Sequence, residues 1–376
     1  MFLPFSFMKV ALGFFFLAFY LTSAMCQQLP TQSKQAQVRR NPSASADPRV
    51  EQAQRLVRDN RKPEAEDLLR EILERTPNSK EANILLGNLL IEQQQFEEAE
   101  QHFEAVLMLN LHDEAARIGE RKAAIGLALQ DRHAGNGEAS LQSLEHARTF
   151  LYDDPVILTD LGVAADALHD YERAGDALEA ALKYKPNDPT ALYGLARTES
   201  DRDRPQKAEA LFRSYLALRP NDASAHYGLG RLFQRQQRTD EAAVEFRRSI
   251  ALQPIQTESY FQLGQMALDA HRDEDARAMF DKTLSRLPSH GGARTGLGIL
   301  EFRAGDFKSA RNSLEQAIAS SPDYEPAHYY LGLTLARLGD KAASKLELAE
   351  AAELAKQQQD KGKPIEGTAP KSPAGP

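Results

Sequence analysis

Histidine, cysteine and paired carboxylates are the residues of this sequence that could support catalysis or bind a metal. The 376-residue chain has nine histidines and one cysteine, Cys26. His133 follows Asp131 closely, but no further ligand stands at metal-binding spacing. The adjacent Glu97 and Glu98 are typical of a solvated helix surface rather than of an acid–base pair. The sequence contains no zincin, nucleophile-elbow, phosphate-loop or dinucleotide motif, so it predicts a non-enzyme without a metal or cofactor.

The amino-acid composition argues against several further classes of protein. There are 46 basic and 54 acidic residues, giving a net charge of −8. An acidic balance argues against a general nucleic-acid binder, which needs a basic surface. The apolar share of 42% and the charged share of 27% are typical of a folded globular protein. A single cysteine excludes an internal disulfide framework and a cysteine-rich zinc cluster.

The first 26 residues have the pattern of a secretory signal peptide. Lys9 precedes an apolar run over 10–21, and small residues follow at 22–24. The run is shorter than the roughly 20 residues that span a bilayer. We therefore expect an exported protein, periplasmic or extracellular. An uncleaved anchor and lipidation of Cys26 are the alternatives, although Ser23 and Met25 fit a lipidation site poorly.

Small residues and prolines recur with a period of 34 over most of the remaining chain. The prolines are Pro186, Pro220, Pro254, Pro288 and Pro322, with Pro77 in the same role. The small residues of the first column are Gly87, Ala196, Gly230, Gly264, Gly298 and Gly332, and those of the second are Ala65, Ala174, Ala208, Ala242, Ala276 and Ala310. Several columns with one period indicate a repeat architecture.

Each period predicts two amphipathic helices, as at 225–235 and 240–252. The small residues let the two backbones approach, and Phe103, Phe212, Phe246 and Phe280 fill the adjacent space. Glycine followed by aspartate, as in Gly305-Asp306, predicts the turn between the two helices. His226 and His328 occupy equivalent places in two units, so we expect them to pack rather than to bind metal.

These columns resemble the tetratricopeptide repeat family. The segment 223–256 matches the family pattern with Gly230, Ala242, Phe246, Ser249 and Pro254. The resemblance covers about 46–356. It implies an all-α, right-handed superhelical solenoid of about nine helix–turn–helix units.

Some parts of the chain depart from the pattern. The third unit has Arg121 and Ser140 at small-residue positions, and about seven extra residues predict an inserted loop at about 131–137. The first unit has Ala53 in place of glycine, and the ninth has Ser344 and Lys356, as expected of terminal caps. The polar segments 27–45 and 357–376 are expected to be a disordered linker and tail.

The resemblance also implies a binding surface. In the family, the first helices line a concave groove through positions 2, 5, 9, 12 and 13 of each unit. The residues at these positions that we expect to bind a partner are Tyr193, Arg197, Tyr227, Arg231, Gln234, Arg235, Phe261, Gln265 and Tyr329. Aromatic residues and arginine are enriched at binding hot spots, and arginine can hold a carboxylate through two hydrogen bonds. Packing of the aromatic rings against the next unit is the alternative interpretation.

The resulting hypothesis is an exported, non-enzymatic scaffold or adaptor. It would bind a peptide, helix or acidic segment of another protein in the groove, in envelope assembly or secretion. No nucleic-acid partner is expected, and membrane association would come only through an N-terminal lipid or signal anchor. A glycan-binding envelope protein and an accessory subunit of an enzyme complex are the rival hypotheses.

Overall fold

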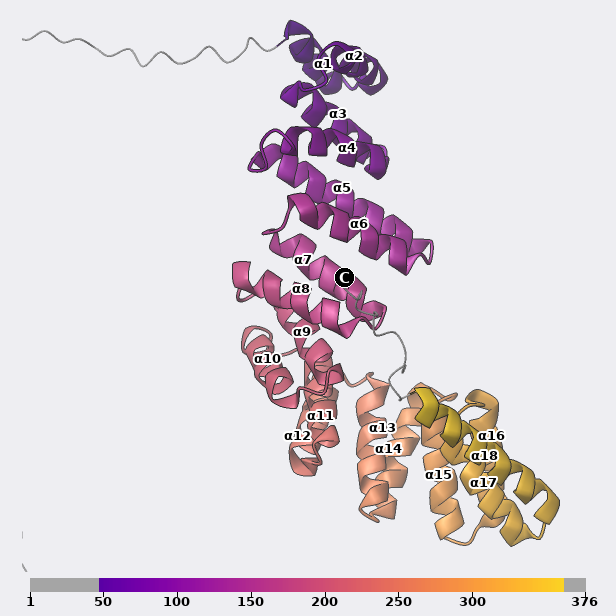
Figure 1. Cartoon of the computed structure of the whole chain (residues 1–376). Helices are drawn as coiled ribbons and strands as arrows, with labels where there is room; N and C mark the ends of the chain where they lie inside the picture. The colour runs from indigo at the N-terminus through magenta and orange to yellow at the C-terminus, as the bar shows by residue number, and fades with distance from the viewer. Residues whose placement is uncertain (1–46, 362–376) are drawn as a thin grey trace, which may run out of the picture. The chain divides into compact units, whose positions relative to one another are not determined.

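The computed structural model describes residues 47–361, and all the regular structure in this range is α-helical. The helices are α1 (Pro48–Arg58), α2 (Lys62–Arg75), α3 (Lys80–Glu92), α4 (Phe96–Leu107), α5 (Glu114–His133), α6 (Gly137–Phe150), α7 (Pro155–Ala167), α8 (Tyr171–Tyr184), α9 (Pro189–Asp201), α10 (Pro205–Leu218), α11 (Ala223–Arg235), α12 (Thr239–Leu252), α13 (Thr257–Asp269), α14 (Asp273–Arg286), α15 (Gly291–Arg303), α16 (Phe307–Ser320), α17 (Glu325–Leu338) and α18 (Lys341–Lys361). Figure 1 labels them along the chain.

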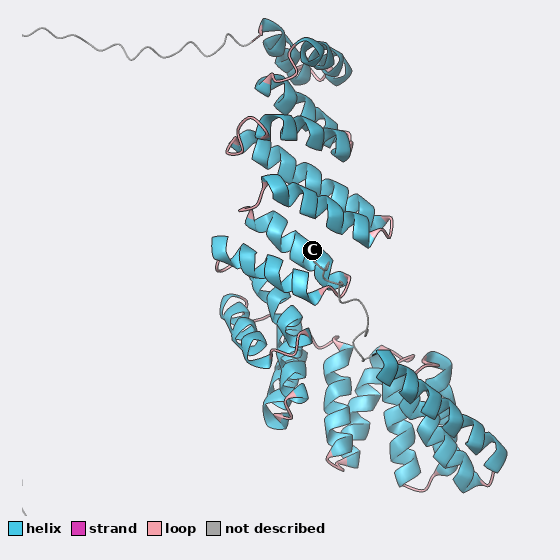
Figure 2. Ribbon diagram, viewed as in Figure 1, coloured by secondary structure: helices cyan, strands magenta, loops and turns pink. Residues whose placement is uncertain are grey.

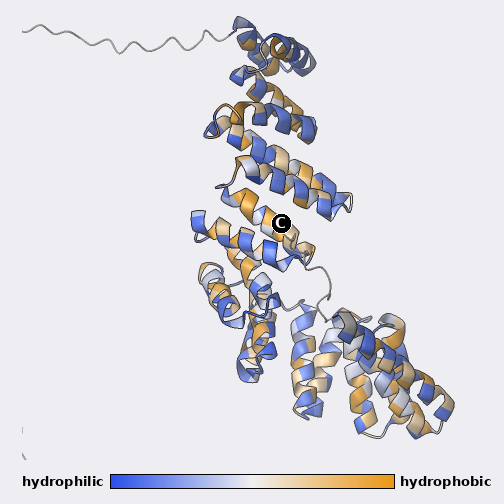
Figure 3. Cartoon of the chain, viewed as in Figure 1, coloured by the Kyte–Doolittle hydropathy of each residue, from blue (hydrophilic) through white to orange (hydrophobic). Residues whose placement is uncertain are grey.

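Consecutive helices form a stack of pairs. Each odd-numbered helix packs on the helix that follows it, and each even-numbered helix packs on the next pair (Figures 1 and 2). Apolar and polar residues alternate along the helices, as Figure 3 shows, so each helix buries one face against its neighbours. The all-α solenoid of helix pairs that the sequence predicts is therefore confirmed.

The turns within the units require a residue in the left-handed conformation. Gly305 and Gly339 have φ of 78° and 88°, and Asp306 and Asp340 then cap α16 and α18 through backbone N–H groups. These turns confirm the predicted glycine–aspartate signal. Six other turns place a non-glycine residue at positive φ, among them Asn60 and His271, and the sequence carries no comparable signal for them.

The turns between units use the proline carbonyl as a hydrogen-bond acceptor. The Nε2 atoms of His226 and His328 lie 3.2 and 2.7 Å from the carbonyl oxygens of Pro220 and Pro322. Their Nδ1 atoms lie against Glu245 and Glu347 carboxylates on the second helix of the same unit. The two histidines thus tie successive units together, which confirms their predicted packing role.

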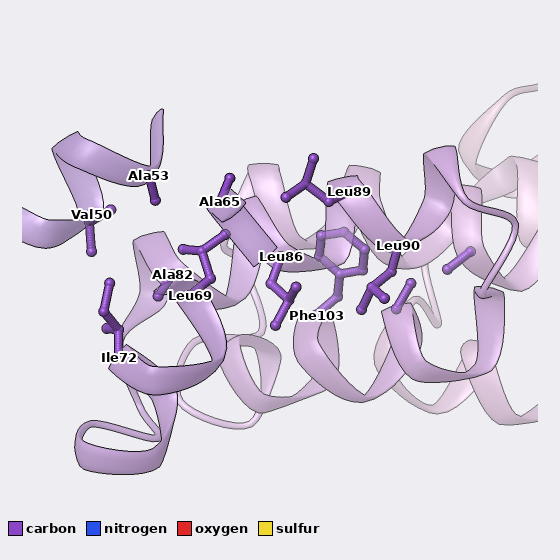
Figure 4. Close-up of a cluster of buried hydrophobic side chains, with 12 residues drawn as sticks. Val50, Ala53, Ala65, Leu69, Ile72, Ala82, Leu86, Leu89, Leu90 and Phe103 are labelled. Carbon is purple, nitrogen blue, oxygen red and sulfur yellow. The ribbon is translucent and has the colours of Figure 1, made fainter. Parts of the chain in front are cut away.

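A large side chain between two small residues forms the centre of many units. The Phe103 ring is fully buried, and a Cβ atom built on Gly87 would come within 2.6 Å of its Cζ. A Cβ on Gly119, from the next unit, would overlap the same ring. Figure 4 shows Phe103 among Leu86, Leu89 and Leu90. Both helices that flank the ring therefore need glycine at the point of closest approach.

The same sandwich recurs along the chain. The large residue lies between the glycine of its own unit and a glycine six positions into the next unit. The triplets are Gly162–Leu178–Gly194 and Gly264–Phe280–Gly296. The second glycine of each triplet is a column that the sequence analysis did not identify.

The third unit differs from its predicted form. The extra residues do not form a loop over 131–137, since α5 has 20 residues where α7 has 13, and only Ala134, Gly135 and Asn136 separate it from α6. An insertion of about seven residues adds two helical turns and keeps the buried face in register. Arg121, at a predicted small-residue position, extends to Asp154, with Nε 2.7 Å from Oδ2.

The C-terminal end of the solenoid lies further along the chain than the sequence predicts. α18 continues to Lys361, so the first residues of the predicted tail, 357–361, are helical. The buried Ala351 and Leu354 hold α18 on its neighbours. The predicted signal peptide 1–26 and linker 27–45, and the remainder of the tail, lie outside the described residues.

Candidate partner-binding groove

The helices α9 and α11 bring most of the predicted binding residues together. Tyr193 and Arg197 are one turn apart on α9, and Tyr227 and Arg231 are one turn apart on α11, which packs beside α9. We use the name groove face for the surface formed by Thr190, Tyr193, Arg197, Ser224, Tyr227, Arg231, Gln234 and Arg235. Both helices begin at an aspartate that caps their first turn, Asp188 and Asp222.

The aromatic residues of the groove face are half-buried. The Tyr193 ring packs on Phe212 and Tyr215, with centroids 6.1 and 5.2 Å away. The Tyr227 ring lies 5.9 Å from Phe246. Each ring therefore packs on the second helix of its own unit rather than on the next unit, and part of it remains accessible to a ligand.

The arginines of the groove face differ in their partners. Arg197 lies 3.4 Å from the Asp166 carboxylate. Arg235 donates to the Ser200 carbonyl at 2.8 Å and lies 3.8 Å from the Asp201 carboxylate.

Arg231 is the exception. It contacts the Tyr227 hydroxyl at 3.2 Å and forms no ion pair among the described residues, although its charge helps His290 to lower the pKa of Glu258. Arg231 is thus the cation of the groove face that is available to an acidic ligand. Gln234, on the same helix, is half-buried.

An open hollow of about 800 Å³ lies at the N-terminal ends of α9 and α11. Its lining includes Thr190, Tyr193, Tyr215, Asp222 and Ser224. The Tyr215 hydroxyl donates to Asp222 at 2.5 Å. Burial, followed by this hydrogen bond, raises the pKa of Tyr215 to about 12, so the phenol stays protonated and holds the wall of the hollow in place.

Thr190, Ser224 and Tyr215 are not among the binding residues that the sequence predicted. Thr190 and Ser224 stand at position 2 of their units, which is a groove position in the family pattern. Their place in the repeat could therefore have predicted that they line the groove. Tyr215 belongs to a second helix, and only the packing of α10 against α9 brings it to the hollow.

The remaining predicted residues lie further along the chain. Phe261 and Gln265 are half-buried on α13, and the Phe261 ring packs on Phe280 and on His290. Tyr329 on α17 is 44% exposed. On α15 between them the equivalent residue is Thr295, which is buried and donates to the Gly291 carbonyl. The aromatic row is therefore interrupted before Tyr329.

A separate group of carboxyl groups is buried where the second and third units meet, between α4 and α5. Glu120 on α5 is fully buried, and neither of its carboxyl oxygens has a hydrogen-bond partner. Glu100 on α4 is also buried, with one oxygen unpartnered. Burial raises the pKa of Glu120 to about 9 and that of Glu100 to about 7, with neighbouring carboxylates adding to both effects. Beside them, the Glu104 carboxylate oxygen Oε1 lies 2.5 Å from Nε2 of His146, within hydrogen-bond distance.

Comparison with known families agrees with this architecture. Sequence models described as tetratricopeptide repeat match residues 56–119 and 167–232, and others of the same description match 227–291, 261–311 and 295–361. The chain belongs to the tetratricopeptide repeat family. Between these matches, residues 120–166 are not covered; they contain most of the divergent third unit with its longer α5.

Solved structures share the fold. A tetratricopeptide repeat protein from Parabacteroides merdae is 16% identical, with a TM-score of 0.53, over 64% of this chain and 95% of its own. The Cut9–Hcn1 hetero-tetramer of the APC/C contains a chain that is 15% identical, with a TM-score of 0.51, over 78% of this chain and 56% of its own. No curated protein matches the sequence.

The described residues lack two further features. Among them, no helix combines the length and the apolar composition needed to cross a bilayer. In the same range, histidine, cysteine and acidic side chains do not converge in a group of three suited to a metal ion.

Proposed function

We propose that this tetratricopeptide repeat protein is an exported, non-enzymatic scaffold that holds a segment of another protein against the groove face. Proteins of this family bind other proteins or peptides, and the half-buried aromatic rings of α9 and α11 offer apolar contact at low entropic cost. The observation that carries the proposal is the free guanidinium of Arg231 beside Tyr227.

The ligand that fits this arrangement is a segment with a carboxylate. Arg197 and Arg235 are already neutralised by Asp166 and Asp201, so they shape the surface rather than attract an anion. Arg231 can hold a side-chain or C-terminal carboxylate, and the adjacent hollow at Thr190 and Ser224 has room for the residues that flank it.

Replacing Tyr227 by alanine and Arg231 by glutamate should weaken partner binding by about 5- to 150-fold for each anchor lost, from the roughly 1–3 kcal/mol typical of hot-spot residues. The measurement is affinity capture from an envelope extract with chain 27–376, followed by titration of the captured protein. Circular dichroism should show equal helical content and equal melting for both forms.

The matched control is Arg248→Glu, the same charge change at an exposed residue of α12 outside the groove face. It should leave capture unchanged. Equal loss in both variants would indicate a general charge effect and contradict the groove. Retention on a polysaccharide column without competition by protein would instead favour a glycan-binding function.

Export has its own test, because the proposal for it rests on the signal-peptide pattern of residues 1–26 alone. In a bacterial expression host, replacing Leu17 and Leu21 by arginine should leave the precursor uncleaved inside the cell. Cell fractionation and the mass of the N-terminus measure this directly. An unprocessed wild-type chain in the cytoplasmic fraction would contradict export.

A further inference from the structure

A second hollow, of about 400 Å³, opens between α12, α13 and α14. Its apolar lining comes from Ile250, Leu263, Met266, Ala267 and Met279. Its polar lining includes three basic residues, Arg247, Arg272 and Lys282, and one acidic residue, Asp275. None of these residues belongs to the groove face, so a ligand here would not compete with one bound there.

The rim of this hollow has an excess of positive charge. Arg272 lies 3.5 Å from Asp275, which neutralises it. Arg247 and Lys282 are exposed and take part in no ion pair among the described residues. The Lys282 ammonium lies 5.8 Å from the Tyr260 ring, and an aromatic face attracts a cation without neutralising it. Two free cations therefore stand beside an apolar floor.

The equivalent hollow one unit earlier shows what is specific here. It lies between α10, α11 and α12, and its charged residues are already satisfied within the protein. Arg213 is paired with Glu209, Glu241 with Arg238, and Glu245 with His226. The same place in the repeat thus carries a neutralised rim in one unit and an unneutralised basic rim in the next.

The apolar floor differs as well. Phe233 lines the earlier hollow, and the Arg238 guanidinium lies 4.1 Å from its ring centroid. One period later the equivalent residues are Ala267 and Arg272. The small Ala267 leaves space beneath Arg272 for an apolar group that the chain does not itself supply.

We propose that the hollow between α12 and α14 is a second docking site, which takes one large apolar side chain from an acidic peptide segment of a partner protein. The apolar floor would accept the side chain, and Arg247 and Lys282 would pair with carboxylates on either side of it. A scaffold with two such sites holds two segments at once, one on α9 and α11 and the other between α12 and α14.

The test uses fluorescein-labelled peptides of sequence DEDEFDEDE and DEDESDEDE with the full mature chain, followed by fluorescence anisotropy at low salt. The phenylalanine peptide should bind at least tenfold more tightly than the serine peptide. The double variant Arg247→Glu/Lys282→Glu changes only exposed side chains and should weaken binding at least tenfold. Ala267→Phe should abolish the preference for phenylalanine.

Arg213→Glu is the control, since it reverses the charge at the position equivalent to Arg247 in the earlier hollow. It should leave the affinity unchanged. The proposal is overturned if the two peptides bind equally, or if Arg213→Glu and Arg247→Glu/Lys282→Glu have equal effects. Loss of binding in Tyr227→Ala/Arg231→Glu but not in Ala267→Phe would place the peptide in the groove instead. Binding of laurate without binding of peptide would identify an anionic lipid site and also overturn it.

Discussion

Replacing Phe103 by alanine should lower the free energy of unfolding of the surrounding units by about 3–5 kcal/mol. The ring is fully buried between Gly87 and Gly119, which lie on helices of two successive units. Its removal leaves a cavity whose walls are helix backbones, and these cannot collapse without separating the units from their other contacts. The loss therefore affects both the unit and its junction with the next.

The matched control for this prediction is Phe103→Leu. Leucine occupies the same place in the fourth unit, where Leu178 lies between Gly162 and Gly194. The leucine variant should lose less than half of the stability that the alanine variant loses. Hydrogen exchange is the appropriate measurement, because a repeat array can open locally without unfolding throughout. Loss of protection spread evenly from α1 to α18 would contradict a local effect.

Raising the pH from 5 to 9 should destabilise the packing of the second unit on the third by several kcal/mol, which is opposite to the usual behaviour of carboxyl groups. Glu120 and Glu100 are buried, and their pKa values in the folded state are raised above the ordinary value of 4.5. The folded state keeps protons that the unfolded state has released. Their contribution to the free energy of unfolding is complete below about pH 4.5 and is lost as the pH rises through the folded pKa values, at about 1.4 kcal/mol per pH unit for each group.

The variant Glu120→Gln tests this directly, because the amide is neutral at every pH and nearly the same size. The midpoint of urea unfolding should change less between pH 5 and pH 9 in the variant than in the parent chain. Glu138→Gln makes the same change at an exposed site on α6 and should preserve the pH dependence of the parent. The same slope in the Glu120→Gln variant and the parent would show that Glu120 is ionised in the folded state.

The repeat architecture followed from the sequence because its signal is local. The 34-residue spacing of Pro220 and Pro254, and the glycine–aspartate turn at 305–306, depend on backbone rules that act within one helix pair. Tyr193 and Tyr227 were predicted as binding residues because both stand at position 5 of their units. The structure places them on α9 and α11, which contact each other. Their role in binding stays a prediction.

Contacts between successive units were decided only by the tertiary structure. Gly119 is an ordinary helix residue until the ring of Phe103 from the preceding unit is packed against it. The seven extra residues of the third unit read as a loop, but they extend α5 because two whole turns keep its buried face in register.

The ion pairs of the groove-face arginines also depend on the tertiary structure. Arg197 and Arg231 occupy equivalent positions in successive units, yet Asp166 pairs with Arg197 whereas Arg231 forms no ion pair among the described residues. The repeat period places a helix, but the neighbouring helix determines which side chains are satisfied. The repeat pattern within the sequence therefore specifies the solenoid. The unpaired cations and the surface hollows of the solenoid depend on how successive units pack against each other.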